Sequence, residues 1–114
     1  MTLTIWHNPR CTKSRQTLAL LEENGHVPVV RRYLDDAPTE AELRAAAAAL
    51  GVKPIEMMRT KEPEFKAEGL TKDSPDDALF AAMARIPKLI ERPIVFSGDK
   101  AAIGRPPETV LAIL

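Results

Sequence analysis

The sequence predicts an α/β fold, a mixed four-stranded sheet with a helical insertion between the second and third strands. A short apolar run at 3–6, a helical pattern at 12–23 and a β-branched run at 27–34 give the order β-α-β. Two strands joined by a helix in this way run parallel, with a right-handed crossover. The segment 93–104 holds two further short strands about a turn, and the stretch 39–85 carries helical patterns and caps.

The β-α-β unit begins with a strand from Leu3 to Trp6. A helix from about Thr12 to Glu23 follows, and Asn24-Gly25 supplies residues that commonly end a helix. Val27 to Leu34 is the expected second strand, because β-branched residues are frequent in it. Pro28 near its start indicates a strand end or a sheet edge, since proline has no N–H to donate to a neighbouring strand.

The insertion, about 39–85, begins with a capping box. The hydroxyl of Thr39 is expected to cap the helix while Glu42, three residues later, reaches back to the cap. Gly51 is expected to end this helix. Ser74 is the expected cap of a later helix, with Pro75 at its first position. Shorter helices are predicted at Pro54–Arg59 and Glu62–Glu68.

The C-terminal segment is predicted to form an antiparallel hairpin and a last short helix. The strand Pro93–Ser97 and the returning strand Ala101–Gly104 flank Gly98-Asp99, a pair typical of hairpin turns. Pro106-Pro107 then opens the helix. The order β-α-β, helical insertion, β-β-α around a mixed sheet is the layout of a thioredoxin-like fold.

The composition indicates a single domain, 1–114. The chain has 114 residues, 45% of them hydrophobic, which suits one compact core. Its 16 basic and 16 acidic residues give a net charge of zero, which argues against general binding of nucleic acids or anionic membranes. No run approaches the ~20 apolar residues that span a bilayer, and the N-terminus lacks the pattern of a secretory leader. A single cysteine excludes an internal disulfide, and we expect a cytoplasmic protein.

That cysteine, Cys11, lies where the first turn meets the first predicted helix. The unpaired N–H groups and the dipole at a helix N-terminus favour an anion, and the thiolate is the reactive form of cysteine. Arg10, Lys13 and Arg15 add positive charge, so the pKa of Cys11 should fall. A lone cysteine is most often a small buried residue. The polar surroundings of Cys11 favour a catalytic nucleophile instead.

Two polar neighbours of Cys11 have two interpretations each. Ser14 completes a C-x-x-S spacing and either bonds locally to the backbone or supports the thiolate. His7 is either a structural histidine or an imidazole that tunes the thiolate or moves a proton. Because the motif lacks a second cysteine, another molecule must resolve any covalent intermediate on Cys11. No metal is expected, since one cysteine and two histidines (His7 and His26) do not give a zinc-ligand spacing.

Three arginines lie at the ends of predicted elements, namely Arg59, Arg92 and Arg105. Taken singly, each is more commonly a surface charge. Arginine forks, however, bind tetrahedral oxyanions through paired hydrogen bonds. Together with a thiolate at a helix N-terminus, the three would form an oxyanion pocket.

Several motifs occur along the chain in a fixed order: His7-Asn8-Pro9-Arg10-Cys11, then Ser14-Arg15, Arg59, Glu91-Arg92-Pro93-Ile94-Val95 and Gly104-Arg105-Pro106. With these motifs the chain resembles the single-cysteine arsenate reductases that work with glutathione and glutaredoxin, a family with a thioredoxin-like fold and a helical insertion. The resemblance covers Thr4 to Leu114. It implies that Cys11 is the nucleophile, that His7 helps to lower its pKa, and that Arg59, Arg92 and Arg105 bind the oxyanion. Ser14 and Arg15 then flank the anion loop, and the cis-proline of the family falls on Pro93.

The resemblance also implies a mechanism. The Cys11 thiolate attacks arsenate, glutathione attacks the arseno-cysteine adduct, glutaredoxin removes the glutathione and arsenite leaves. Glutathione is then a co-substrate, and no tightly bound cofactor is implied. Two other functions stay open: a thiol-redox regulatory or binding module on the same fold, and a glutathione-linked thiol oxidoreductase with another substrate.

Overall fold

The computed structural model describes residues 2–114, which form two compact units. The first, here called the sheet unit, runs to Asp36 and resumes as Arg92–Leu114. The second, the helical unit, is Ala37–Glu91. The helical unit contains the whole predicted insertion, 39–85, and extends it to Glu91. The assignment of the chain to one domain stays a prediction.

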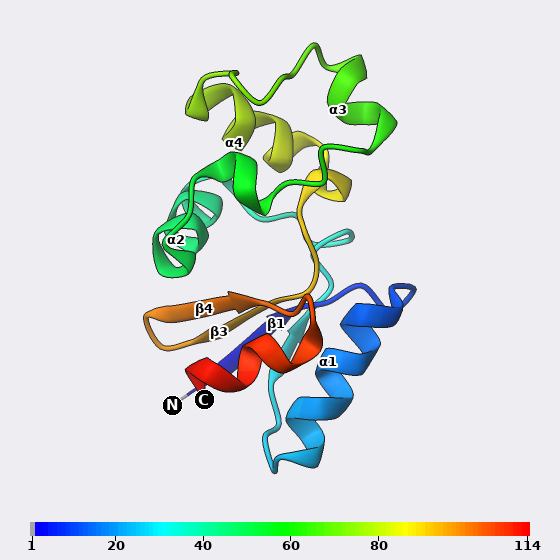
Figure 1. Cartoon of the computed structure of the whole chain (residues 1–114), viewed down its shortest axis with the longest axis vertical. Helices are drawn as coiled ribbons and strands as arrows, with labels where there is room; N and C mark the ends of the chain where they lie inside the picture. Colours follow the sequence, from blue (N-terminus) through cyan, green and yellow to red (C-terminus); the bar gives the residue numbers. More distant parts are fainter. Residues whose placement is uncertain (1) are drawn as a thin grey trace. The chain divides into compact units, whose positions relative to one another are not determined.

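The sheet unit is built on a mixed four-stranded sheet in the order β2-β1-β3-β4 (Figure 1). The parallel pairing of β1 with β2 and the antiparallel hairpin of β3 and β4 confirm the predicted directions. Strand β1 also pairs antiparallel with β3, which makes β1 and β3 the central strands. The elements of this unit are β1 (Leu3–Trp6), α1 (Thr12–Glu23), β2 (Val29–Arg31), β3 (Ile94–Ser97), β4 (Lys100–Ile103) and the 3₁₀ helix η3 (Pro107–Ile113).

Helix α1 and the C-terminal η3 cover the same face of this sheet (Figure 1). Alternate residues of a strand point to one face, so this core takes every second position of β1 and β3. Burying each large aliphatic side chain contributes about 1.5–3 kcal/mol. The buried cluster consists of Leu3, Ile5, Leu21, Val95, Ala102 and Val110, with Leu18 and Ile113 packed against it.

Strand β2 is shorter than its predicted range of 27–34. Pro28 precedes the strand and cannot donate to it, and pairing with β1 begins at Val29. Pairing ends at Arg31 because the chain then turns, and the carbonyl of Arg32 accepts hydrogen bonds from the N–H groups of Asp35 and Asp36 at 3.0 and 2.9 Å. The edge position that Pro28 indicated is confirmed by the strand order.

The helical unit packs α2 against α4, with two 3₁₀ helices beside them. The predicted capping box is present: the N–H of Glu42 donates to Thr39 Oγ1 at 3.1 Å, and the N–H of Thr39 donates to Glu42 Oε1 at 3.0 Å. Gly51 ends the helix in the left-handed region, with φ of 70°. The elements are α2 (Glu40–Leu50), η1 (Pro54–Met57), α3 (Pro63–Ala67), α4 (Asp76–Arg85) and η2 (Pro87–Leu89).

The prediction that Ser74 caps the last long helix is wrong. Pro75 occupies the N-cap position of α4, one residue later than expected. Ser74 Oγ instead accepts a hydrogen bond from the N–H of Thr71 at 2.9 Å, so the side chain closes the preceding turn. Within residues 2–114, no helix has both the length and the apolar character needed to span a bilayer.

Candidate active site

The sheet register brings three chain segments together at one end of the strands of the sheet. Trp6 pairs with Ile94, and Ile94 pairs with Ile103. The end of β1, the start of β3 and the end of β4 therefore lie side by side. The residues just beyond these positions belong to the motifs singled out in the sequence, namely the turn 7–11, Arg92-Pro93 and Gly104-Arg105.

Cys11 is the N-cap residue of α1, with extended backbone angles of φ −93° and ψ 123°. Its N–H donates to the carbonyl of Asn8 at 3.0 Å, which closes the turn between β1 and α1. Its carbonyl accepts the N–H of Arg15 at 3.0 Å, which starts the helix. The residue is half-buried and its sulfur is a free thiol. The predicted position of Cys11 at a helix N-terminus is confirmed.

The pKa of the Cys11 thiol lies below its ordinary value, although burial acts in the other direction. Burial is the largest single influence and raises the pKa. The backbone N–H of Ser14, the side chain and charge of Arg92, and the backbone N–H of Lys13 lower it, and together they prevail. The side chain makes no capping hydrogen bond of standard geometry. The amides that lower the pKa belong to the first turn of the helix, where an anion is favoured.

Ser14 joins the helix to the turn before it. It is fully buried, and its Oγ lies 2.6 Å from Nδ1 of His7 while accepting the N–H of Asn8 at 3.0 Å. The side chain of Asn8 is occupied too, since its Oδ1 accepts the N–H of Arg10 at 3.0 Å. Through these buried hydrogen bonds, the first turn of α1 is held to the residues that precede Cys11.

His7 is buried and its pKa is lowered, first by burial and then by the positive charges of Arg32 and Arg15. A histidine with a pKa below 6.5 is neutral at pH 7. Its ring then has one lone pair and one N–H, so the hydroxyl of Ser14 can donate to an unprotonated Nδ1. His7 thus bonds to the side chain of Ser14, the residue whose backbone N–H lowers the pKa of the thiol.

Arg15 braces the turn from the solvent side. Its Nη1 donates to the carbonyl of Pro9 at 3.0 Å, and its Nη2 donates to Thr12 Oγ1 at 3.3 Å. Arg15 thus ties the first turn of α1 back to the residues before Cys11.

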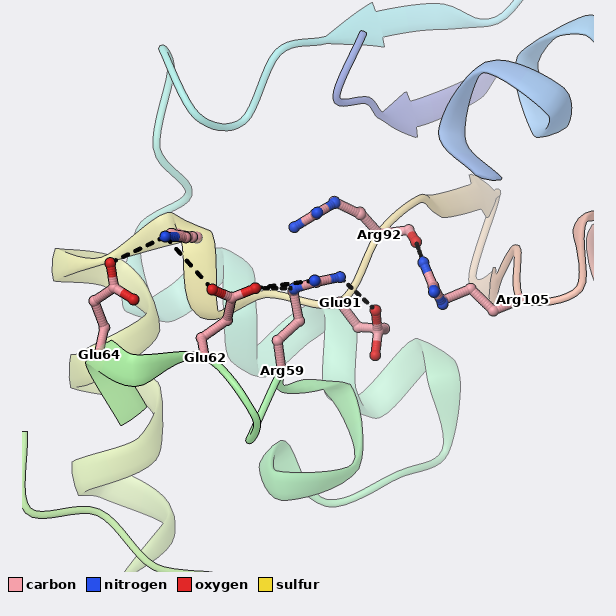
Figure 2. A network of polar contacts seen from close by, with 7 residues as sticks. Arg59, Glu62, Glu64, Glu91, Arg92 and Arg105 are labelled. Carbon is pink, nitrogen blue, oxygen red and sulfur yellow. Dashed lines mark hydrogen bonds and ion pairs between the residues drawn. The ribbon is translucent and has the colours of Figure 1, made fainter. Parts of the chain in front are cut away.

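Arg92 and Arg105 are joined by a hydrogen bond at this end of the strands (Figure 2). Arg105 Nη1 donates to the carbonyl of Arg92 at 3.2 Å. The Arg92–Pro93 peptide bond is cis, as the resemblance implies, and so is the Arg105–Pro106 bond, which the sequence did not indicate. The pKa of Arg92 is influenced first by burial, which lowers it, but contacts with Cys11 and Tyr33 raise it overall.

Two residues whose packing sequence reasoning missed, Tyr33 and Gly104, lie at this end of the sheet. Tyr33 is fully buried and contacts Arg92. Gly104 is closely packed: a Cβ there would lie 2.5 Å from Thr17 Oγ1 and 2.9 Å from Pro93 Cγ. A signal for Gly104 was present in the Gly-Arg-Pro motif, where a glycine before a site residue indicates close backbone approach. Tyr33 is the only tyrosine of the chain, but nothing in the sequence pointed it toward Arg92.

Arg59 belongs to the helical unit, where two carboxylates hold its guanidinium (Figure 2). Glu62 Oε1 accepts from Arg59 Nε at 3.0 Å and lies 2.9 Å from Nη2, while Glu91 Oε1 lies 3.5 Å from Nη1. Lys88 completes the network, 3.4 Å from Glu62 Oε2 and 3.2 Å from Glu64 Oε2. The pKa of Glu62 is lowered, chiefly by the hydrogen bond from Arg59. Sequence reasoning did not identify this network.

Comparison with known proteins identifies the family. The family model described as ArsC family matches residues 6–113, nearly the whole chain. The chain belongs to the ArsC family. It is 49% identical over 116 residues to an arsenate reductase of Haemophilus influenzae, with both chains covered in full. It is also 50% identical to the uncharacterized protein YfgD of Escherichia coli, over 96% of this chain and 94% of the relative.

A solved structure extends the comparison to the fold of this ArsC-family chain. An arsenate reductase from Vibrio cholerae matches with a TM-score of 0.96 and 52% identity, over 100% of this chain and 98% of that one. The predicted thioredoxin-like fold with a mixed four-stranded sheet is therefore confirmed. Across residues 2–114 of this ArsC-family chain, no group of three or more histidine, cysteine or acidic side chains is arranged to hold a metal ion.

Proposed function

We propose that this ArsC-family chain is an arsenate reductase whose nucleophile is the Cys11 thiolate. The observation that carries the proposal is the setting of the sulfur, at the N-terminus of α1 and in contact with Arg92, where the thiol pKa is lowered. The names of relatives at 46–49% identity agree with it. A thiolate beside cationic donors suits an electrophile that is itself an oxyanion.

The proposed substrate-binding residues are Arg59, Arg92 and Arg105. Arg92 contacts the nucleophile, and Arg105 is held to the carbonyl of Arg92. Arg59 has its fork oriented by two carboxylates within the helical unit. A guanidinium group can donate two parallel hydrogen bonds to two oxygens of a tetrahedral oxyanion. Each arginine can therefore bind substrate oxygens and stabilise the negative charge that develops on them.

The proposed supporting residues act by holding the turn around Cys11. Ser14 and His7 fix it from the core, and Arg15 fixes it from the surface. Pro93 packs against the position of Gly104 and keeps the start of β3 close to α1. The proposed role of His7 is to hold Ser14, whose Oγ lies 2.6 Å from its Nδ1.

In the proposed reaction, two thiols supply the two electrons that reduce arsenate to arsenite. The Cys11 thiolate forms a bond to arsenic(V), and one arsenate oxygen leaves as water after taking up protons. Glutathione supplies the second thiol, and the two sulfurs give up two electrons in becoming a disulfide while arsenic(V) becomes arsenic(III). In sum, one arsenate and two thiols give one arsenite, one disulfide and one water.

The proposed thiol partners are glutathione as co-substrate and glutaredoxin as the protein that regenerates Cys11. The spacing Cys11 to Ser14 supports this proposal, because the chain has no second cysteine with which to close an internal disulfide. A tightly bound cofactor has no place in the proposed reaction. A reducing compartment such as the cytoplasm, where glutathione is abundant, is the proposed location.

The test is arsenate-dependent oxidation of NADPH, coupled through glutathione, glutaredoxin and glutathione reductase. The wild type is expected to turn over with arsenate, and Cys11→Ser is expected to give only the blank rate, because an alcohol at this position is not ionised. Replacing glutathione and glutaredoxin with thioredoxin and its reductase tests the thiol partner separately. A wild-type rate no greater than that of Cys11→Ser with either thiol system would sink the proposal.

A further inference from the structure

A cavity of about 320 Å³ lies against the turn that carries Cys11. All of its walls belong to the sheet unit, and they come from the turn 7–10 and from the segment that follows β2. Its volume is at the lower end of the range of small-ligand pockets. The lining residues are His7, Asn8, Pro9, Arg10, Arg32, Leu34 and Asp35.

The charged side chains that line this cavity form no ion pair with other described residues. Among the residues that the structure describes, no carboxylate pairs with the guanidinium of Arg10 or Arg32, and no cation pairs with the carboxylate of Asp35. Nearby, Arg15 of α1 donates hydrogen bonds to Pro9 and Thr12. The cavity thus presents two cations and one anion to solvent, and the apolar Leu34 lies between Arg32 and Asp35 in the chain.

The same cavity is next to the nucleophile through the backbone. Cys11 follows Arg10 directly, and its N–H is bonded to the carbonyl of Asn8. Cys11 does not itself line the cavity, but Asn8 and Arg10 do, so the cavity borders the turn that carries the nucleophile. A second thiol that must attack an adduct on Cys11 needs a site in this position.

We propose that this cavity, lined by Arg10, Arg32, Leu34 and Asp35, is the binding site of the resolving thiol, a glutathione-like tripeptide. Glutathione carries two carboxylates and one ammonium at neutral pH, the complement of the two guanidinium groups and the one carboxylate of the cavity. Arg10 and Arg32 bind the carboxylates, and Asp35 binds the ammonium. The choice of glutathione rests on the proposed function, but the binding site itself can be tested without arsenate.

The first experiment measures binding of S-methylglutathione, which cannot react as a thiol, by NMR titration at pH 7.5. Shift changes are expected at the backbone N–H groups of Asn8, Arg10 and 32–35. Arg32→Gln should weaken binding about tenfold, because one charge-assisted hydrogen bond is lost. Lys100→Gln, which removes the same charge from the exposed start of β4, should leave the affinity unchanged. Esterification of both ligand carboxylates should weaken binding to the wild type by about tenfold or more.

The second experiment separates this site from the proposed function. In the coupled assay, Arg32→Gln should raise the KM for glutathione about fivefold or more while changing the KM for arsenate less than about twofold. Arsenate reduction by the wild type with equal S-methylglutathione affinity in Arg32→Gln would overturn the site and leave the function standing. Binding as expected without arsenate reduction would support the site and overturn the function. Shift changes confined to residues outside the cavity would overturn the site in either case.

Discussion

At the scale of single residues, the ionisation of Cys11 depends on opposing effects. Burial disfavours the thiolate, while the first N–H groups of α1 and the side chain of Arg92 favour it. The amides belong to the backbone and cannot be removed by substitution. Arg92 is therefore the residue through which the balance can be changed.

Arg92→Gln should lower kcat/KM for arsenate about 10- to 100-fold in the coupled assay. The expected loss corresponds to a charge-assisted hydrogen bond of about 1.5–3 kcal/mol. Arg92→Lys should recover only part of the rate, because a point charge does not replace the fork. The pKa of Cys11 should rise in Arg92→Gln.

The control for Arg92 is Arg85→Gln, which breaks an exposed ion pair with Glu68 in the helical unit. This variant should keep the wild-type rate, since surface ion pairs contribute little. An Arg92→Gln enzyme whose activity falls only as much as its stability in urea would indicate a structural role for Arg92.

The candidate site residues could be selected from the sequence because their types and spacing are visible there. Cys11 was found through its turn, and Arg92 and Arg105 through the motifs around Pro93 and Pro106. The partners of these residues could not be predicted. The bond between Ser14 and His7, and the contact of Tyr33 with Arg92, depend on side chains that meet only when the sheet forms.

At the scale of elements, the packing of α1 against the start of β3 and the end of β4 positions the site. Gly104 is central to it, since its N–H donates to the carbonyl of Pro93 at 2.9 Å and its Cα faces Thr17. Thr17 is fully buried, and its Oγ1 donates to the carbonyl of Lys13 at 2.8 Å. No side chain larger than hydrogen fits at position 104 without movement.

Gly104→Ala should lower the free energy of unfolding by about 1–3 kcal/mol, the usual cost of overpacking. The measurement is urea denaturation followed by circular dichroism. The double variant Gly104→Ala/Thr17→Ala should be less unstable than the sum of the two single variants, because the nearest clash is with Thr17 Oγ1. A Gly104→Ala protein as stable as the wild type would show that the helix moves away at no cost.

Elements were predicted well where local signals act alone and less well where tertiary pairing decides. The capping box at Thr39 and the glycine stop at Gly51 are local, and both are present. The length of β2 depends on its partner β1, so the apolar run 27–34 extended the prediction beyond the paired residues. The hydroxyl of Ser74 accepts the N–H of Thr71 in the preceding turn, and this hydrogen bond replaces the one expected at the start of α4.

At the scale of the whole molecule, the order of elements was enough to predict a mixed sheet and the directions of its first and last strand pairs, but not the pairing of β1 with β3. Right-handed crossover and hairpin rules leave few arrangements for β-α-β followed by β-β-α. The grouping of Ala37–Glu91 into a compact unit of its own was not predicted, because the apolar faces of its short helices do not reveal which neighbour they pack against.

The central claim is that folding lowers the pKa of the Cys11 thiol. Because the folded pKa is below the unfolded one, the thiolate stabilises the fold above the unfolded pKa, and this contribution is lost as the pH falls through the folded pKa. The unfolded chain supplies the reference, a free thiol with a pKa of about 8.5.

The most direct test is the rate of alkylation of Cys11 by iodoacetamide as a function of pH, measured on the native protein and on the chain unfolded in urea. Since Cys11 is the only cysteine, the rate reports on this thiol alone. We predict a native titration midpoint clearly below that of the unfolded chain. A native midpoint equal to or above the unfolded one would mean that burial outweighs the helix and Arg92, and would contradict the account.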